Sequence, residues 1–196
     1  PFPFGLTPGA LAEDTLSANG ILKELDKGGV SYGLLLAVYA PRSVGITTNE
    51  FVIKAAGESE RLYGLASLSI EKWSSSKEVQ LSALRTALEH PNMVGVKLAH
   101  THQNFRMDDP DYFEIYEVAG ELQAPVYLHT GSSALPGTNP AAPYIDPRYM
   151  EDAFQRYPDT KFILGHMCYD FINESSEPMK NCFELAAKYE NVWLEP

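Results

Sequence analysis

Residues 109–129, DPDYFEIYEVAGELQAPVYLH, contain the pattern that decides the fold: an amphipathic helix followed directly by a short apolar strand. Asp109 is a typical helix N-cap residue, and Pro110 suits the first helical turn. The apolar residues that follow recur every three or four positions, which is the spacing of one buried helix face. Pro125 then opens an apolar run that ends in His129. We therefore predict a helix that leads into a buried strand.

The same unit recurs along the whole chain at intervals of about 30 residues. We predict helices at 17–27, 49–60, 75–90, 109–122, 146–157 and 177–189, and strands at 30–39, 62–70, 92–98, 125–129, 161–166 and 191–195. Ser75 and Glu78 have the spacing of a capping box for the third helix. Strands that alternate with helices in this way indicate parallel βα units.

Two arrangements fit this rhythm, a doubly wound open sheet and a TIM barrel. A complete barrel has eight strands in about 250 residues. We predict an α/β fold of the (β/α)8 TIM-barrel type, incomplete in these 196 residues, with about six βα units and the first and last strands missing. Residues 1–196 are expected to form a single domain and to be a fragment of a longer chain. Open strand edges promote association, so we expect a homo-oligomer.

Charge excludes several classes of partner. The chain has 15 basic and 26 acidic residues, a net charge of −11, whereas nucleic acids and anionic membranes select basic surfaces. No apolar run approaches the roughly 20 residues of a membrane span, and no signal peptide is recognisable at the start. We expect a small-molecule substrate and a cytoplasmic location. Cys168 and Cys182 are too few for a disulfide framework, so we expect reduced thiols. Cys168 is more plausible as an inert buried thiol than as a nucleophile.

Chemistry in parallel α/β folds lies at the carboxyl ends of the strands. Four otherwise apolar strands end in a polar residue, namely Lys97, His129, His166 and Glu195. A buried polar residue is costly unless it is paired or binds a ligand. Because imidazole is the commonest metal ligand, the two histidines predict a metal that activates water or a metal ligand beside a general base. The alternative is a hydrogen-bonded core histidine at each position.

Lys97 and Glu195 leave more alternatives open. A buried lysine at position 97 could be carbamylated to bridge two metals, bind a substrate carboxylate, or form an ion pair inside the barrel mouth. Glu195 is equally consistent with a charge at the rim. His100 and His102 follow the third strand in what we predict to be a polar loop, where a substrate-facing or exposed position is favoured over a metal pair. The Gly-, Ser- and Pro-rich segment 130–145 is a candidate substrate-covering loop.

Motifs for other activities are missing. The sequence contains no GxGxxG, GxxxxGK[ST] or GxSxG pattern, which argues against dinucleotide or NTP binding and against a nucleophile elbow.

Five segments in fixed order resemble the amidohydrolase superfamily, specifically the amidohydrolase-related group that includes aminocarboxymuconate-semialdehyde decarboxylase and related aromatic-acid decarboxylases. These segments are Gly95-Val-Lys-Leu98, Phe105-Arg-Met-Asp-Asp-Pro110, Ala124-Pro-Val-Tyr-Leu-His-Thr-Gly131, Tyr157-Pro-Asp-Thr-Lys-Phe-Ile-Leu-Gly-His-Met167 and Glu190-Asn-Val-Trp-Leu-Glu195.

This resemblance implies a distorted TIM barrel that holds one divalent metal ion, often zinc. It implies that His129 is a metal ligand and that His166 activates water or substrate. Family members hydrolyse C–N or C–O bonds, including lactones, or decarboxylate acids without oxidation. The family's HxH motif on the first barrel strand and its aspartate on the last strand have no counterpart here. His100-Thr-His102 is not that motif, because it follows the fourth barrel strand.

The sequence therefore predicts a metal-dependent hydrolase of a small organic substrate. We assign His166 as catalytic, His129 as a metal ligand, and Lys97, His100, His102 and Glu195 as substrate-binding. A non-oxidative decarboxylase of an aromatic or muconate-type acid is the alternative. A non-catalytic barrel remnant that serves as a scaffold or binding module is the second alternative.

Overall fold

The computed structural model describes residues 17–195. Its main feature is a six-stranded parallel sheet with the strand order β1-β4-β5-β6-β7-β8. Its strands are β1 (Gly33–Leu36), β4 (Leu62–Ala66), β5 (Met93–Leu98), β6 (Val126–His129), β7 (Phe162–Gly165) and β8 (Val192–Leu194). Each strand pairs with the next one along the chain, apart from a small hairpin after β1. This is the order that successive βα units produce in a barrel.

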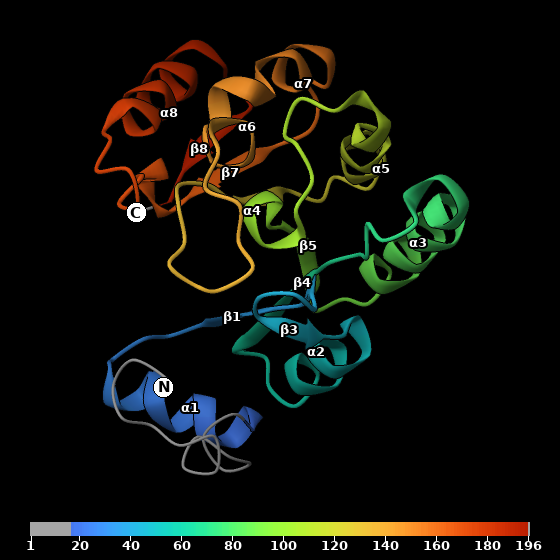
Figure 1. Ribbon diagram of the computed structural model, residues 1–196. Helices are drawn as coiled ribbons and strands as arrows, with labels where there is room; N and C mark the ends of the chain where they lie inside the picture. The colour runs from blue at the N-terminus through green and yellow to red at the C-terminus, as the bar shows by residue number, and fades with distance from the viewer. Residues whose placement is uncertain (1–16, 196) are drawn as a thin grey trace.

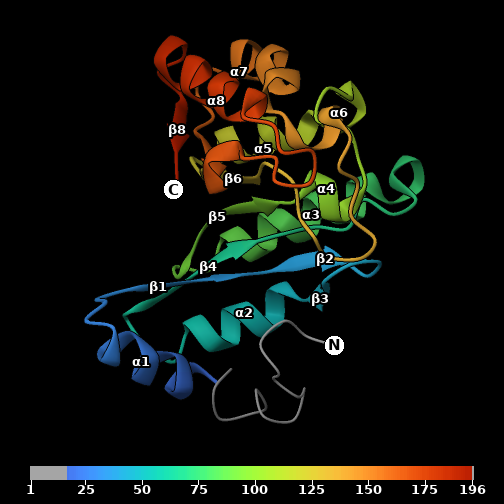
Figure 2. The same cartoon turned by 60° about the vertical axis from the view of Figure 1, so that its left-hand side comes forward.

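Helices separate the strands of the curved sheet (Figure 1). The α-helices are α1 (Ala18–Lys27), α2 (Asn49–Ala56), α3 (Trp73–Leu88), α4 (His100–Gln103), α5 (Glu114–Glu121), α6 (Ala142–Ile145), α7 (Glu151–Arg156) and α8 (Glu177–Lys188). Of these, α2, α3, α5, α7 and α8 lie around the outside of the sheet, whereas α4 lies near the strand ends (Figure 1). The short 3-10 turns are η1 (Pro110–Tyr112), η2 (Pro147–Met150) and η3 (His166–Cys168). The predicted partial barrel is confirmed: six parallel strands alternate with helices, and the arc stays open between β1 and β8 (Figures 1 and 2).

Two local predictions about the first half of the chain are wrong. The predicted strand 30–39 divides at Ala37, and its second part, β2 (Val38–Ala40), pairs antiparallel with β3 (Gly45–Thr47). A short polar turn opened by Pro41 lets the chain fold back as this hairpin. The predicted capping box is also absent, because α3 already begins at Trp73. Ser75 instead donates its hydroxyl proton to the carbonyl of Lys72.

Register places one row of side chains across the middle of the sheet. Lys97 is paired with Tyr127, Tyr127 with Ile163, and Ile163 with Trp193. Side chains in register on neighbouring strands point to the same face. This face is the concave side of the arc, opposite the helices, and His129 lies one step further along it on β6. The strand ends therefore direct several predicted site residues to one place.

The cysteines form a disulfide, which corrects the expectation of reduced thiols. Cys168 in η3 is bonded to Cys182 in α8, and both residues are buried. The cause is local packing, because the turn after β7 lies against α8 and brings the two Cα atoms within 6.2 Å. Because Cys168 is bonded to Cys182, it has no free thiol to act as a nucleophile. Among the helices of residues 17–195, none has both the length and the apolar character required to cross a membrane.

Candidate active site

Three histidines gather at the carboxyl ends of β5, β6 and β7. The ring centres of His129 and His166 are 4.4 Å apart. The ring of His102, on α4 just past β5, meets the ring of His129 edge-on at 4.6 Å. The predicted pair of histidines is thus brought together, and His102 extends it to a row of three.

His129 has the features of a ligand that lacks its partner. Its Nε2 atom is buried and has no hydrogen-bond partner among residues 17–195, although buried polar atoms are almost always paired. Burial lowers the pKa of His129 well below its usual value, and the nearby Lys97, His102 and His166 lower it further. The ring is therefore neutral, which is the form that binds metals.

The described residues supply only part of a metal site. Across residues 17–195, no three His, Cys, Asp or Glu side chains are arranged so as to hold an ion. The unpartnered nitrogen of His129 fits one position in the coordination shell of a divalent cation. The remaining ligands of such an ion would have to come from elsewhere.

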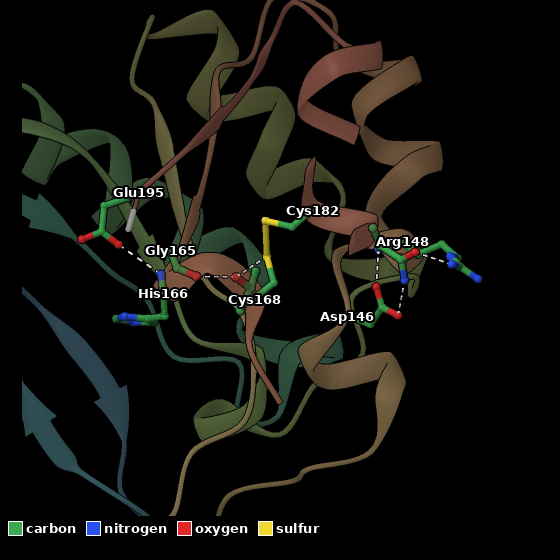
Figure 3. The surroundings of a disulfide bond; sticks show 9 residues. Asp146, Arg148, Gly165, His166, Cys168, Cys182 and Glu195 are labelled. Atoms are coloured by element: carbon green, nitrogen blue, oxygen red, sulfur yellow. Dashed lines mark hydrogen bonds between the residues drawn. A yellow bond between two sulfur atoms is a disulfide. The ribbon is translucent and has the colours of Figure 1, made fainter. Parts of the chain in front are cut away.

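His166 is held by its backbone rather than by its ring. It begins a turn in which three consecutive residues, His166, Met167 and Cys168, have φ values of 61°, 48° and 56°. Non-glycine residues in this region are uncommon and concentrate at functional sites. The His166 N–H donates to Oε2 of Glu195 at 3.1 Å, and the ring points away from the disulfide (Figure 3). Partial burial lowers the pKa of His166, and the positive charge of Lys97 lowers it further. The negative charge of Glu195 raises this pKa.

Thr130 connects the two strand ends behind these rings. Its hydroxyl donates to the carbonyl of Gly165, and it lies 3.0 Å from the sulfur of Cys168. Thr130 follows His129 directly, and Gly165 precedes His166. The Cys168–Cys182 disulfide fastens the far side of the same turn to α8 (Figure 3). The Thr130 hydrogen bond thus connects the backbone next to His129 to the backbone next to His166.

Lys97, Tyr127 and Glu195 form a second group on the same face. The ammonium of Lys97 lies 4.1 Å above the ring of Tyr127, and the Tyr127 hydroxyl donates to Oε2 of Glu195 at 2.8 Å. Burial lowers the pKa of Lys97 to about 7, although the negative charge of Glu195 acts in the opposite direction. Burial and Glu195 both raise the pKa of Tyr127. A buried amine with a lowered pKa thus faces the histidine row.

Tyr127 is the site residue that the sequence reasoning missed. It stands two positions before His129, so strand alternation alone places both side chains on one face. Its hydroxyl also explains Gly165, because a Cβ atom at that position would overlap the Tyr127 ring. Through its ring and its hydroxyl, Tyr127 on β6 contacts both Lys97 on β5 and Glu195 just past β8.

The segment that carries His100 and His102 is not the exposed loop we expected. It forms α4, and both histidines are buried. Residues two apart on a helix point in different directions, so the pair separates. His102 faces His129 and shares a 2.9 Å hydrogen bond between its Nδ1 and the Ser43 hydroxyl. Burial and then Lys97 lower its pKa to about 4.

His100 turns into the core behind the site. It is fully buried, its Nε2 is 3.2 Å from the Tyr116 hydroxyl, and its ring packs against Phe105 at 4.2 Å. Its Nδ1 has no hydrogen-bond partner in the structure. Burial, followed by Lys97, lowers its pKa to about 3. The structure thus brings His102 to the row of histidines and keeps His100 out of it.

The segment 130–145 lies over α4 and is not a free loop. Thr101 donates its hydroxyl proton to the Asn139 carbonyl at 2.8 Å, and the Asn139 N–H donates to the Thr101 carbonyl at 2.9 Å. Gly137, with a φ of 80°, packs so closely on the backbone of Arg42 that a Cβ atom there would overlap it. The segment therefore reaches across to the β2–β3 hairpin, beside the histidines.

The family of this chain follows from a direct match. The amidohydrolase family model matches residues 28–196, so the chain belongs to the amidohydrolase family. No curated protein matches the sequence.

Solved structures share its fold at low sequence identity. An uncharacterised TIM-barrel protein from Bordetella bronchiseptica superposes with a TM-score of 0.71 at 16% identity, covering 91% of this chain and 58% of that one. A probable 2-pyrone-4,6-dicarboxylic acid hydrolase from Acinetobacter baumannii, with citric acid bound, gives a TM-score of 0.55 at 17% identity, with 91% and 58% covered.

A dihydroxybenzoic acid decarboxylase from a Polaromonas species, with manganese and 2-nitroresorcinol bound, gives a TM-score of 0.56 at 20% identity, covering 75% of this chain and 53% of the other. The chain thus spans less than two thirds of the length of these structures. At such identities the likeness establishes the partial barrel and not the reaction.

Proposed function

We propose that this chain carries the core of the active site of a metal-dependent hydrolase that acts on a small organic substrate. The observation that carries the proposal is the buried, unpartnered Nε2 of His129 at a strand end, within the row of histidines. A neutral imidazole in this position is suited to ligate a divalent ion, which we expect to be zinc. Such an ion, when bound, supplies a Lewis acid and lowers the pKa of its water.

His166 is the proposed general base. Its lowered pKa keeps the ring unprotonated near neutral pH, so it is ready to accept a proton from water and to return it to a leaving group. The Glu195 carboxylate holds the backbone of His166 in its left-handed conformation. Lys97, His102 and Glu195 are the proposed substrate-contacting groups, and His100 supports α4 from behind.

A decarboxylase of an aromatic or muconate-type acid is the alternative. The hydrolase and decarboxylase structures superpose equally well, with TM-scores of 0.55 and 0.56, so the fold favours neither reaction. Substrate profiling separates them. Release of carbon dioxide from dihydroxybenzoates supports the decarboxylase, whereas ring opening of lactones or pyrones supports the hydrolase.

Metal content tests the proposal directly. Zinc and manganese are measured after equilibration and dialysis in the unaltered protein and in two variants, His129→Ala and His90→Ala. We expect the first substitution to lower affinity by at least about tenfold, because it removes a ligand. His90, whose ring accepts a hydrogen bond from the Asn92 N–H and lies outside the row of histidines, is the matched control. Unchanged stoichiometry in His129→Ala sinks the ligand assignment, and no bound metal in any sample favours a non-catalytic barrel remnant.

A further inference from the structure

Arg42 differs from every other arginine in the chain. The chain has six arginines, and five form ion pairs with acidic side chains: Arg61 with Asp26, Arg85 with Glu121, Arg106 with Asp108, Arg148 with Glu177 and Arg156 with Asp152. Arg42 forms no such pair within the described part of the chain. In a protein with a net charge of −11, an arginine without a carboxylate partner is conspicuous.

This arginine lines a pocket beside the row of histidines. The pocket has a volume of about 360 Å³ and lies between the β2–β3 hairpin, the start of α3 and the α4 segment. His102 forms part of its wall, and the same ring contacts His129 edge-on. A molecule bound here would thus be separated from the proposed metal ligand by one imidazole ring.

The polar lining of the pocket consists mainly of hydrogen-bond donors. Lys72 also lines the pocket and forms no ion pair with any residue in 17–195. Asn104 accepts a hydrogen bond on Oδ1 from Asn139, which leaves its amide NH2 as the group available to a ligand. Glu71 is the one acidic residue of the lining. Two cations and an amide donor against one carboxylate give the pocket a positive field in a negatively charged protein.

The remaining lining is apolar and partly fixed. Tyr39, Pro41 and Ile70 supply a hydrocarbon wall. Gln103 uses its side chain inside the protein, because it accepts from the Ala99 N–H and donates to the Leu68 carbonyl. It therefore shapes the pocket without competing for a ligand. Such a lining fits a carboxylate attached to a ring or a short hydrocarbon.

We propose that this pocket binds the carboxylate of an organic acid, with Arg42 and Lys72 as the residues that select it. The assignment rests on the proposed function in one respect, since it makes the pocket part of the substrate site. Arginine binds carboxylates through two parallel N–H donors, and lysine acts as a point charge. The contact of Gly137 with the Arg42 backbone holds the hairpin that carries this guanidinium.

Binding of benzoate to the protein tests the proposal without turnover or metal. Benzoate and the neutral benzamide are titrated while amide resonances are followed by NMR. We expect saturable benzoate binding that shifts the resonances of Asn104 and of the β2–β3 hairpin, and no comparable binding of benzamide. The double variant Arg42→Gln with Lys72→Gln should weaken benzoate at least about tenfold. Glu71→Gln should tighten it, because the opposing charge is removed.

A charge-matched control separates local contacts from net charge. Lys54→Gln with Lys180→Gln removes two lysines on α2 and α8 that form no ion pair within residues 17–195, and benzoate affinity should change less than about twofold. Equal weakening in both double variants, equal binding of benzamide, or the absence of saturable benzoate binding would each overturn the pocket assignment. His129→Ala should lose metal and keep benzoate binding. A failure of the metal proposal and a failure of the pocket proposal are therefore distinguishable.

Discussion

The centre and the two edges of the sheet are built from similar apolar residues but have different surroundings. Leu98 on β5 and Leu128 on β6 are fully buried, whereas Leu34 and Leu36 on β1 are 49% and 40% exposed and Trp193 on β8 is 56% exposed. A central strand has neighbours on both sides, and an edge strand has one. Leu98 and Leu128 point to the face that the helices cover, whereas Leu34, Leu36 and Trp193 point to the concave face. Burial of these apolar side chains therefore depends on strand position and helix cover more than on residue type.

The candidate site lies on the concave face of the central strands, where Lys97 is buried and His129 is half-buried. Lys97 and His129 stand on the two central strands, and their perturbed pKa values come mainly from burial. Towards the β8 edge, His166 is exposed and Glu195 is half-buried. Packing of the sheet therefore determines the pKa values of the central residues. The positions of residues near the edge depend instead on local restraints such as the η3 turn and the disulfide.

The largest expected effect is on stability at the centre. Leu128→Ala should lower the free energy of unfolding by about 3–4 kcal/mol, because it leaves a cavity in a fully packed layer. Leu34→Ala on β1, where the side chain is 49% exposed on the concave face, is the edge comparison and should cost less than about 1 kcal/mol. Urea-induced unfolding followed by circular dichroism measures both. Equal costs at the two positions would contradict the difference between centre and edge.

The disulfide should contribute nearly as much from a position near the edge. It closes a loop with a sequence separation of 14, for which the loss of unfolded-state entropy is worth about 3 kcal/mol. Cys168→Ala with Cys182→Ala should therefore lower the free energy of unfolding by about that amount. The His166 ring resonances should also broaden or shift, because η3 loses its tether to α8.

Reductant supplies the control for the disulfide. Dithiothreitol should reproduce both changes in the unaltered protein and have no effect on the double variant. Mass spectrometry that finds two free thiols in the protein purified without reductant would refute the bond. It would also restore the sequence-based expectation of reduced cysteines. A disulfide is a bond of oxidising compartments, so the predicted cytoplasmic location gains no support from it.

Lys97 makes the central site sensitive to pH. Its pKa falls from 10.5 to about 7 on folding, so between these values the unfolded chain binds a proton that the folded protein lacks. Stability then rises with pH across this window, by about 2 kcal/mol between pH 7.5 and 9. Lys97→Met should remove this contribution and flatten the pH dependence. Parallel slopes for the two proteins from urea unfolding would show that the amine is not buried as described.

The strand ends are the part of the structure that sequence reasoning predicts well. The strands that end at Lys97, His129 and His166 are found within one or two residues of their predicted positions, because a short apolar run before a polar residue is a strong local signal. Asp109 and Asp146 act as N-caps as predicted, since both carboxylates accept backbone N–H bonds two residues on. They cap the 3-10 turns η1 and η2, however, and the α-helices α5 and α7 begin only at Glu114 and Glu151.

What escaped prediction depends on contacts distant in sequence. Nothing local distinguishes Tyr127 from other strand tyrosines until Glu195, 68 residues away, accepts its hydroxyl proton. The 14-residue separation of Cys168 and Cys182 does not reveal that η3 packs on α8. Segment 100–103 appears polar in sequence and is buried in part because segment 130–145 lies over it. Spacing predicts which residues share a face of one element, and tertiary packing decides the rest.

The smallest expected effect on stability is at the β1 edge, where the same change should alter association. We predicted a homo-oligomer because unpaired strand edges pair with other chains, and lysine on an edge blocks this. Leu36→Lys should change the free energy of unfolding by less than about 0.5 kcal/mol, since the side chain is already partly exposed. The same substitution should shift the protein towards the monomer in light scattering at matched concentrations. If the unaltered protein is already a monomer, the open edge is not an association surface, and the exposed leucines of β1 must then be tolerated in water.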